Sequence, residues 1–517
     1  MRRTLLPLFL IICGSLWAQD FGFGFDEEGE SSTSGSKAAS FKIGGEVFIE
    51  ATPYIYEFLD EDKFSDISIW NSRIDLSLLS PYIDLITSFN FNNGSISELW
   101  SGSSNLSKWN YTPLIIDEAF ARAYIGPVNI EAGYRKLTWG KADSGGPLDV
   151  TNPIDYSDLR NIDDIRANKI ARPMVHLTLN TGPLSKLEGV FIPNFTGHRF
   201  AQSGRWVPGQ YSNIMNIAEA SIANNAAGKF GSFLLSNLAL VQYFDADSVM
   251  NSVKNEMLLC FNDYNFPFPS TDSIEYFQAG LRYTMTIGSA DIGAQYYYGN
   301  LFRPNVTITG IDAFLNDLIS KVGFTSYLPP VVGLTSPADP ALITPKIKYN
   351  RYHQVGLDYA QILAGFNIRA EAAIFITEDL KGDDGSVQNP FIGWSLGFDR
   401  DLFAGINLNI QCNETIRLFD DKVGDDPVLD AEAGTNMTAT RLSVQLSRKF
   451  LRDKLETKAT IIWDIENSDC FIIPAIIYTT GSMSTEISAG IFTGDTKGEL
   501  GQYWENSFIK LGVRFSF

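Results

Sequence analysis

The sequence of 517 residues predicts an all-β protein: a transmembrane antiparallel β-barrel of about 20 strands, within a range of 18–22. Three observations support this prediction. They are an N-terminal export signal, apolar residues at every second position through most of the chain, and a terminal strand that ends in phenylalanine. The composition agrees, because 13% aromatic residues and 43 glycines favour strands and tight turns over helices.

Residues 1–18 have the pattern of a secretory signal peptide, in which two arginines precede a short apolar run and Ala18 stands before the cleavage site. The apolar run is too short to span a bilayer as a helix. Lipid attachment at Cys13 is an alternative, although a bulky isoleucine precedes this cysteine. Residues 19–39 are acidic and rich in Gly and Ser, so we expect a flexible linker. Residues 40–517 are expected to form the barrel.

The net charge excludes one class of partner, and the cysteines exclude one class of fold. The formal charge is −20, or −22 once the two arginines of the expected leader are removed. A body this acidic repels phosphates, so we expect no binding of nucleic acid. The mature chain would keep Cys260, Cys412 and Cys470. An odd number allows at most one disulfide, so the fold cannot depend on a disulfide framework.

Alternation with a period of two residues is clearest in segments 364–374, 406–413 and 441–447. Apolar residues there alternate with polar or charged ones, so each strand has one face that avoids water and one that tolerates charge. A soluble β-sandwich would show the same alternation. The connections between strands are therefore needed to distinguish the two folds.

Short turns alternate with long polar connections along the chain. We expect short turns at Ser80-Pro81, Gly126-Pro127, Gly182-Pro183, Gly288-Ser289 and Gly481-Ser482, and near Asn224–Lys229, Gln361–Ala364, Arg400–Ala404 and Lys449–Asp453. Longer connections are expected near 93–114, 139–171, 194–212, 245–273, 301–346, 378–390, 418–437 and 495–505, with 467–469 as a short exception. This alternation gives roughly twenty strands and places both termini on the side of the short turns, as in outer-membrane barrels.

The last strand alternates Ile509, Leu511, Val513, Phe515 and Phe517 with polar residues and glycine. A terminal Phe with an aromatic residue two positions earlier resembles the assembly signal of outer-membrane barrel proteins. In lipid every backbone group must be paired, so a sheet must close on itself. We therefore expect export to the outer membrane of a Gram-negative-type (diderm) bacterium. The expected partners are outer-membrane lipid and, through the Phe517 strand, the barrel assembly machinery.

If the apolar face contacts lipid, the opposite face lines the lumen and carries charge of both signs. The lumen-facing candidates are Arg73, Glu118, Arg122, Glu131, Arg135, Arg282, Arg369, Glu371, Arg441, Lys510 and Arg514. One interpretation is a set of ion pairs within the wall. The other is a ladder of arginines that attracts anionic solutes to a water-filled path.

The connection 139–172 is the third long one and carries the candidates for a pore constriction. These are Asp143, Asp149, Asn152, Asp155, Asp158, Arg160 and Arg166. Within it, Trp139-Gly140, Asp143, Asp149-Val150, Asn152-Pro153 and Asp155 resemble the Trp-Gly…Asp…Asn-Pro stretch of a large porin-like family of uncharacterised Gram-negative outer-membrane proteins. The resemblance covers about thirty residues and implies a barrel, and the third loop of general porins suggests constriction by analogy; neither implies a solute. Alternatively, Trp139 belongs to an interfacial aromatic girdle and Asn152-Pro153 only turns the chain.

The connection 301–346 differs because its apolar residues recur at helical spacing, at Ile311, Phe314, Leu315, Leu318, Ile319 and Val322. This spacing predicts an amphipathic helix that packs on neighbouring loops. Alternatively, an apolar connection would cap the barrel or receive an apolar ligand.

Enzymatic motifs are not found in the sequence. The three histidines are scattered, and neither a nucleophile elbow, a phosphate loop nor a paired-Cys zinc pattern occurs. The acidic stretches at Asp383-Asp384 and Asp420–Asp426 lack the spacing of a calcium loop and are interpreted as solvated surface. We expect no catalytic residue, no metal and no cofactor.

The sequence therefore predicts an outer-membrane porin-like channel for passive or selective passage of small solutes. One alternative is a gated channel for apolar or amphipathic molecules, similar to the fatty-acid transporters, although their Asn-Pro-Ala hatch motif is absent from residues 19–50. Another is a surface adhesin on a closed barrel, and a soluble exported all-β protein is the third. A channel for small solutes needs an open lumen, whereas the lumen of an adhesin can be filled by side chains. A channel for apolar solutes needs an apolar pocket beneath the connection 301–346.

Overall fold

The computed structural model describes residues 39–57, 68–92, 116–201, 204–209, 228–245, 251, 269–336, 339–342, 344–426 and 429–517. The expected signal peptide, the expected linker up to residue 38, and Cys260 lie outside the described residues. Among the described residues, no helix is both long and apolar enough to cross a membrane.

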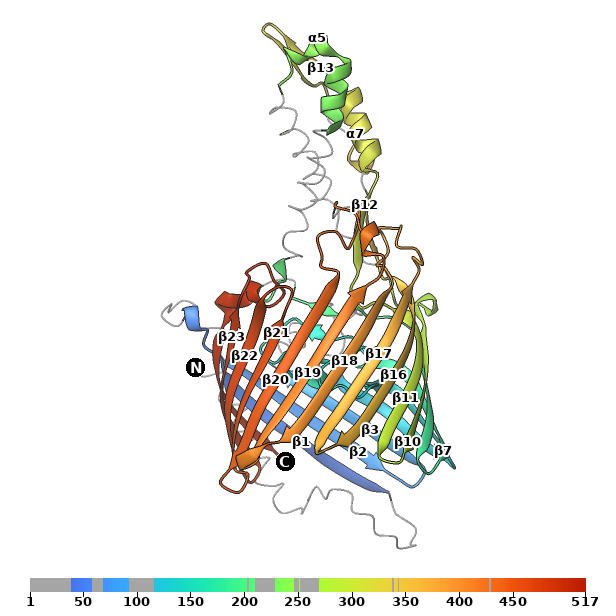
Figure 1. Ribbon diagram of the computed structural model, residues 1–517, viewed down its shortest axis with the longest axis vertical. Coiled ribbons are helices and arrows are strands. Elements are labelled where there is room, and N and C mark those ends of the chain that lie inside the picture. Colours follow the sequence, from blue (N-terminus) through green and yellow to red (C-terminus); the bar gives the residue numbers. More distant parts are fainter. Residues whose placement is uncertain are drawn as a thin grey trace.

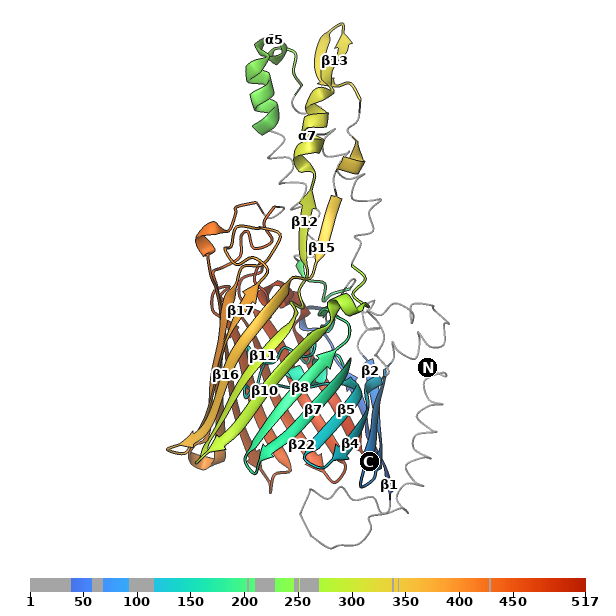
Figure 2. The same cartoon turned by 90° about the vertical axis from the view of Figure 1, so that its right-hand side faces the viewer.

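Eighteen antiparallel strands form one closed barrel (Figures 1 and 2). They are β1 (Ser40–Ala51), β2 (Ser68–Leu79), β3 (Ile83–Asn92), β4 (Ile116–Ile125), β5 (Val128–Arg135), β7 (Arg172–Gly182), β8 (Ser185–Ile192), β10 (Gln278–Ile287), β11 (Ala290–Asn300), β16 (Arg351–Leu363), β17 (Phe366–Thr377), β18 (Phe391–Asp401), β19 (Ile406–Arg417), β20 (Thr438–Phe450), β21 (Leu455–Asp464), β22 (Asp469–Thr480), β23 (Met483–Thr493) and β24 (Phe508–Ser516). Each strand pairs with the next in this order, and β24 pairs with β1 to close the sheet. The predicted fold is confirmed, and 18 strands lie within the predicted range.

The predicted hairpin near Asn224–Lys229 is wrong where the structure describes it. Residues 228–236 are helical, and α5 (Leu238–Val241) follows them. The whole stretch from β8 to β10 is therefore one connection, which accounts for the two strands by which the tally exceeds the barrel. The other short turns fall where they were predicted, and residues 465–468 form the one short connection on the opposite side.

Successive residues of each strand face lipid and lumen in turn. In β10, Leu281 and Tyr283 are 57% and 38% exposed on the outside, whereas Arg282 between them is only 4% exposed. Exposed outward aromatics lie near both ends of the strands: Tyr478 and Phe515 towards the short turns, and Phe191 and Trp463 towards the long connections. An apolar outer surface between two aromatic bands suits a sheet that spans a bilayer.

The remaining elements belong to the connections. They are η1 (Ile55–Glu57), β6 (Asp155–Tyr156), α3 (Ile165–Asn168), β9 (Arg199–Phe200), η5 (Ile274–Tyr276), β12 (Asn305–Thr309), α7 (Ile311–Ser320), β13 (Val322–Tyr327), β14 (Pro330–Leu334), η6 (Pro340–Leu342), β15 (Thr344–Lys348), η7 (Phe403–Gly405), η8 (Asp420–Lys422) and η9 (Gly501–Asn506).

The connections from β8 to β10 and from β11 to β16 build a projection beyond the barrel (Figures 1 and 2). The predicted helix is confirmed as α7, with Ile311, Phe314, Leu315 and Leu318 buried. These side chains are buried within the projection. Residues 228–245 contribute to it too, because Phe244 pairs with β14 and Lys229 forms a 2.6 Å ion pair with α7. The apolar residues of α7 therefore lie away from the barrel and do not cap it (Figure 2).

Candidate functional site

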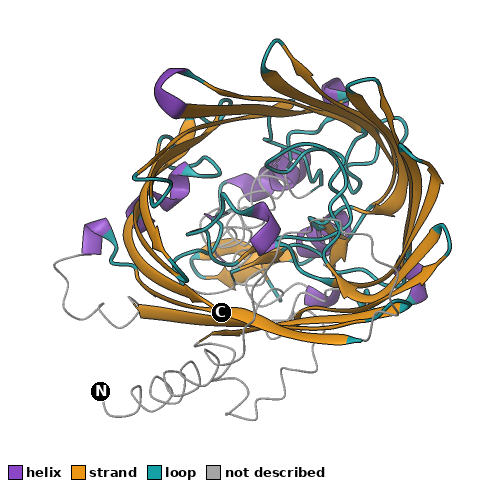
Figure 3. Ribbon diagram, turned by 90° about the horizontal axis from the view of Figure 1, so that it is seen from below, coloured by secondary structure: helices purple, strands orange, loops and turns teal. Residues whose placement is uncertain are grey.

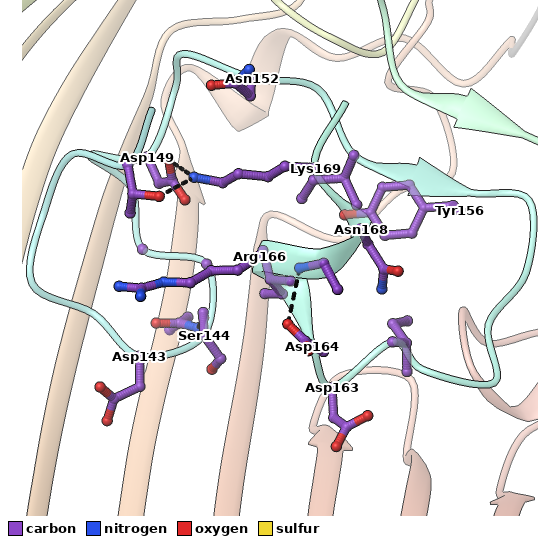
Figure 4. Close-up of a pocket in the computed structure, with 18 of the residues that line it drawn as sticks. Asp143, Ser144, Asp149, Asn152, Tyr156, Asp163, Asp164, Arg166, Asn168 and Lys169 are labelled. Atoms are coloured by element: carbon purple, nitrogen blue, oxygen red, sulfur yellow. Dashed lines mark hydrogen bonds and ion pairs between the residues drawn. The ribbon is translucent and has the colours of Figure 1, made fainter. Parts of the chain in front are cut away.

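The connection between β5 and β7, residues 136–171, folds into the barrel; we call it the lumen loop. Viewed along the barrel axis, loop segments cross the ring of strands (Figure 3), and contacts of residues 137–150 with inward-facing side chains of the wall place this loop inside the barrel. The lumen loop, shown in Figure 4, contains β6 and α3, and its two halves contact different parts of the wall. Its residues therefore determine how much of the lumen remains open.

The first half packs on the wall formed by β7 to β17. Leu137, Trp139, Leu148 and Val150 of the loop join one buried cluster with Met174, Val190, Ile192, Tyr297, Tyr352, Ala373 and Phe375. Trp139 is 3% exposed and lies edge-on to Tyr297, with ring centroids 6.3 Å apart. The alternative that Trp139 belongs to an interfacial girdle is therefore wrong, because apolar contacts hold this side chain inside the barrel.

Glycines of the wall make room for this packing. A Cβ atom at Gly356 of β16 would lie 2.2 Å from Leu148, and one at Gly280 of β10 would lie 2.7 Å from Trp139. Such distances are far below van der Waals contact. The wall and the loop fit each other at these positions, and larger side chains would push the loop into the open lumen.

Polar side chains of the wall satisfy the main chain of the loop. Glu371 of β17 accepts hydrogen bonds from the N–H groups of Lys141, Ala142 (2.7 Å) and Leu148 (3.3 Å). Gln411 of β19 accepts from the two N–H groups after Ala142, at 2.8 and 3.2 Å. Because a loop inside a barrel has no ladder of its own, these side chains supply the partners that its backbone requires.

The second half of the loop reaches the opposite wall, formed by β1 and β21 to β24. Leu159 is buried in a second cluster with Tyr54, Trp206, Ile462, Phe471, Ile473, Phe492, Leu500, Tyr503 and Phe508. Arg160 forms a 3.2 Å ion pair with Glu50 of β1, and Lys510 of β24 donates to Asn161 at 3.0 Å. The lumen loop is therefore fastened on both sides and spans the barrel.

Asn152 ties the two stems of the loop together. Its Oδ1 accepts from the N–H of Leu137 at 2.8 Å, and its Nδ2 donates to the carbonyls of Arg135 and Ile170, both at 2.9 Å. The side chain is 2% exposed, so no water replaces these bonds. The Asn-Pro pair of the motif thus does more than turn the chain.

A buried ion pair lies beside the Asn152 side chain. Lys169 Nζ is 2.7 Å from Asp149 and donates to Thr138 Oγ1 at 2.7 Å (Figure 4). Burial raises the pKa of Asp149 and lowers the pKa of Lys169, and their mutual attraction opposes both shifts. The pair adds a polar contact within the loop without adding net charge to the lumen.

His198 connects the lumen loop to two other connections. Its Nδ1 accepts from the N–H of Ile154 at 2.9 Å, and its ring lies against Tyr156 and Phe302, with centroids 5.2 and 5.0 Å away. Burial, together with the nearby Arg303, lowers the pKa of His198 to about 3. The ring is therefore neutral at physiological pH, as its acceptor role requires.

Glu499, in the connection from β23 to β24, forms ion pairs with two arginines. It lies 2.7 Å from Arg441 of β20 and 2.8 Å from Arg303 of the connection after β11. Arg441, with Arg303, lowers the pKa of Glu499 to about 2, although burial opposes this shift. Three parts of the chain that are distant in sequence thus meet beside the pore.

The predicted constriction residues do not all reach the open lumen. Asp143, Asp149, Arg160 and Arg166 line the cavity, whereas Asn152 borders it but is only 2% exposed. Asp155 is instead paired with Arg199 at 2.8 Å, and Asp158 is paired with Arg160.

Of the predicted lumen-facing residues, nine line the cavity, whereas Arg282 and Glu371 lie in the wall and are each 4% exposed. The loop covers Glu371, and Arg282 is paired with Asp358 at 2.7 Å. Each predicted arginine and lysine has a carboxylate within 4.0 Å. The wall therefore contains ion pairs and not a ladder of free arginines.

Some residues that shape the site were not predicted. Gln411 lies on the inward phase of a strand that was recognised, so its facing could have been deduced from the alternation. Gly280 and Gly356 also lie on inward phases, but nothing local distinguishes them from other glycines. His198 and Glu499 carry no signal, because their partners are far away in the sequence.

One cavity of about 2270 Å³ remains beside the loop. Its lining includes fifteen basic and fifteen acidic side chains, so the lumen has no large excess of either sign. Among the cations of this lining, taken over the described residues, only Arg166 has no carboxylate within 4 Å. Arg166 extends from α3 and lies between Asp149 and Ser144 in the view of Figure 4.

Comparison with known proteins gives no assignment from sequence, since no protein-family model and no curated protein matches the chain. Among solved structures, the chain is similar to OccK11 (OpdR) of Pseudomonas aeruginosa, with 8% identity, a TM-score of 0.42, and coverage of 93% of this chain and 96% of that one. A BenF-like porin of Pseudomonas fluorescens Pf-5 has 9% identity, a TM-score of 0.43, and coverage of 93% and 98%. OccAB3 of Acinetobacter baumannii has 10% identity, a TM-score of 0.43, and coverage of 93% and 99%.

Proposed function

We propose that the protein is a porin-like channel of the outer membrane of a diderm bacterium, through which small solutes pass passively or selectively. The observation that carries this proposal is the cavity itself, because a single space extends between the two ends of the barrel. Its lining includes Asn129 and Asn407 beside the short turns, and Arg417 and Thr435 beside the long connections. A space with these boundaries supports a path past the lumen loop.

The character of the lining indicates which solutes would pass. Most of its charges are held in ion pairs, and asparagines occur throughout it. Paired charges offer hydrogen bonds without a strong net field, which suits small polar solutes. The guanidinium of Arg166 attracts anions locally, and within the described residues the carboxylates of Glu118, Asp164, Glu414 and Asp464, which also have no cation within 4 Å, attract cations elsewhere in the lining.

The other functions have less support. An adhesin on a closed barrel does not need the cavity, and a channel for apolar molecules does not account for a lining with thirty charged side chains. We also propose transport without catalysis, and insertion through recognition of the last strand. Phe515 and Phe517 are 39% and 42% exposed at its end, where an assembly factor would contact them.

The test is conductance in a planar bilayer, with the mature chain refolded and residues 143–168 present or deleted. We expect steady ion conductance that grows, or loses its ion preference, on deletion, because the deleted residues include most of the side chains that cross the lumen. A matched control removes residues 311–334, which lie in the projection away from the barrel, and should leave the conductance unchanged. A folded, heat-modifiable barrel that does not conduct ions, with residues 143–168 either present or deleted, would refute the proposal that the protein is a channel.

A further inference from the structure

We propose that Glu371 of β17 is the positioning residue of this channel: it holds the lumen loop at one place in the pore and thereby sets the opening that solutes meet. This inference rests on the proposed function. Glu371 lies in a regular strand, more than 220 residues after the loop in sequence, and does not line the cavity itself. Its role would therefore be indirect, through the loop that it holds.

The loop wraps around the Glu371 carboxylate. Oε1 accepts from the N–H groups of Lys141 and Ala142, and Oε2 accepts from that of Leu148. The three donors come from the two ends of a single bend in the chain. One wall side chain therefore holds both ends of this bend.

Two glycines allow the backbone to approach this closely. A Cβ atom at Gly140 would lie 2.3 Å from Oε1 of Glu371, and one at Gly146 would lie 2.2 Å from Oε2. Gly140 also has a φ of +96°, a conformation that other residues rarely adopt. The glycines on both sides of the bend are thus accounted for by the carboxylate that fits between them.

The carboxylate depends on the loop in turn. Glu371 is 4% exposed, and within the described part of the chain no basic side chain forms an ion pair with it. A buried carboxylate without a cation must be stabilised by hydrogen-bond donors, and here these are main-chain N–H groups of the loop. Loop and wall residue therefore stabilise each other.

The side chains next to this bend line the pore. Asp143 forms an ion pair with Arg369 and accepts from Asn409 at 2.7 Å, and all three residues line the cavity. Release of the neighbouring N–H groups would allow Asp143 to leave these partners. The opening would then change in both width and charge.

The experiment combines hydrogen exchange with single-channel recording on the full refolded barrel. The variants are E371Q, E371A and the conservative E371D, and the control is E46Q. Unlike Glu371, Glu46 lines the cavity, and its ion pair is with Arg514, at 3.5 Å, and not with the loop. E371Q and E46Q both replace a glutamate with its neutral amide, but only E371Q changes a side chain that contacts the loop. The two variants are therefore compared by amide exchange in the loop.

We expect amide exchange in residues 140–150 to accelerate about tenfold or more in E371Q and E371A, because hydrogen bonds to a charged acceptor are lost. Conductance should become noisier and the reversal potential should shift in these two variants. E371D should restore both properties in part, and E46Q should leave the exchange unchanged. Barrel folding is checked separately by heat modifiability.

Each other result would overturn a distinct claim. Unchanged exchange in E371A would show that Glu371 does not hold the loop. Faster exchange with unaltered conductance and reversal potential would show that it holds the loop without setting the pore. A wild-type protein that folds but does not conduct would refute the proposed function, whereas the exchange data would still report on the loop.

Discussion

Arg166 offers the most direct test of how the lumen treats charge. Fourteen of the fifteen cations in the cavity lining have a carboxylate within 4.0 Å, and Arg166 is the exception in the described part of the chain. With equal numbers of basic and acidic side chains, the lining is formally neutral. R166Q would change this formal charge to −1, and R166E would change it to −2.

The size of the effect follows from Coulomb's law. A monovalent ion that passes about 4 Å from one full charge in water gains about 1 kcal/mol, which is roughly a fivefold change in its partition into the pore. R166Q should therefore lower the partition of anions into the pore by roughly fivefold and raise that of cations by a similar factor, and R166E should change both free energies by about twice as much. Screening reaches about 10 Å in 0.1 M salt and about 3 Å in 1 M, so the effect should shrink at high salt.

The assay is the reversal potential across a KCl gradient, measured at both salt concentrations. R166K keeps the charge and should remain close to wild type. K229Q is a control for a charge lost outside the lumen, because Lys229 lies in the projection and pairs with Asp312 there. An R166Q channel with the wild-type reversal potential would show that ions do not pass close to this guanidinium. If R166K shifted as far as R166Q, side-chain shape and not charge would be responsible.

Three further predictions concern the loop and its surroundings. N152A should destabilise the folded barrel by roughly 3 kcal/mol, since it leaves one buried N–H and two carbonyls without partners at about 1 kcal/mol or more each. The temperature at which the folded band disappears from a gel measures this loss. An unchanged temperature would show that the hydrogen bonds of Asn152 do not stabilise the barrel. G280A should cost about 1–3 kcal/mol through overpacking, because its Cβ would lie 2.7 Å from Trp139, and should speed exchange in residues 137–150; normal exchange would show that the wall yields instead. The pKa of His198 is about 3 in the folded protein and about 6.5 in the unfolded chain, so between these pH values only the unfolded chain binds the proton. The free energy of unfolding should therefore decrease as the pH is lowered from 6.5 towards 3, by at most about 1.4 kcal/mol per pH unit. H198Q, whose amide oxygen can still accept from Ile154, should lose less stability than wild type over this range, and equal losses would contradict the pKa assignment.

The barrel itself could be predicted because its signals are local. Lipid on one side and water on the other impose a period of two residues on each strand, so segments such as 364–374 and 406–413 show their two faces without knowledge of their neighbours. Turns at Gly126-Pro127 and Gly288-Ser289 are local in the same way. The prediction failed near Asn224–Lys229, where turn residues and apolar runs gave the same signal for a helical connection as for a hairpin.

The interior depended on contacts that no local pattern contains. The sequence by itself determined which residues the lumen loop carries, including Asn152, Asp143 and Arg166. Only the tertiary structure decided that Asp143 meets Arg369, that Asn152 closes the loop, and that Glu371 lies inside a bend more than 220 residues earlier. The alternation along a strand shows which residues face the lumen, but it contains no information on which residues they contact there. These contacts form only because closure of the barrel brings opposite walls against the same loop.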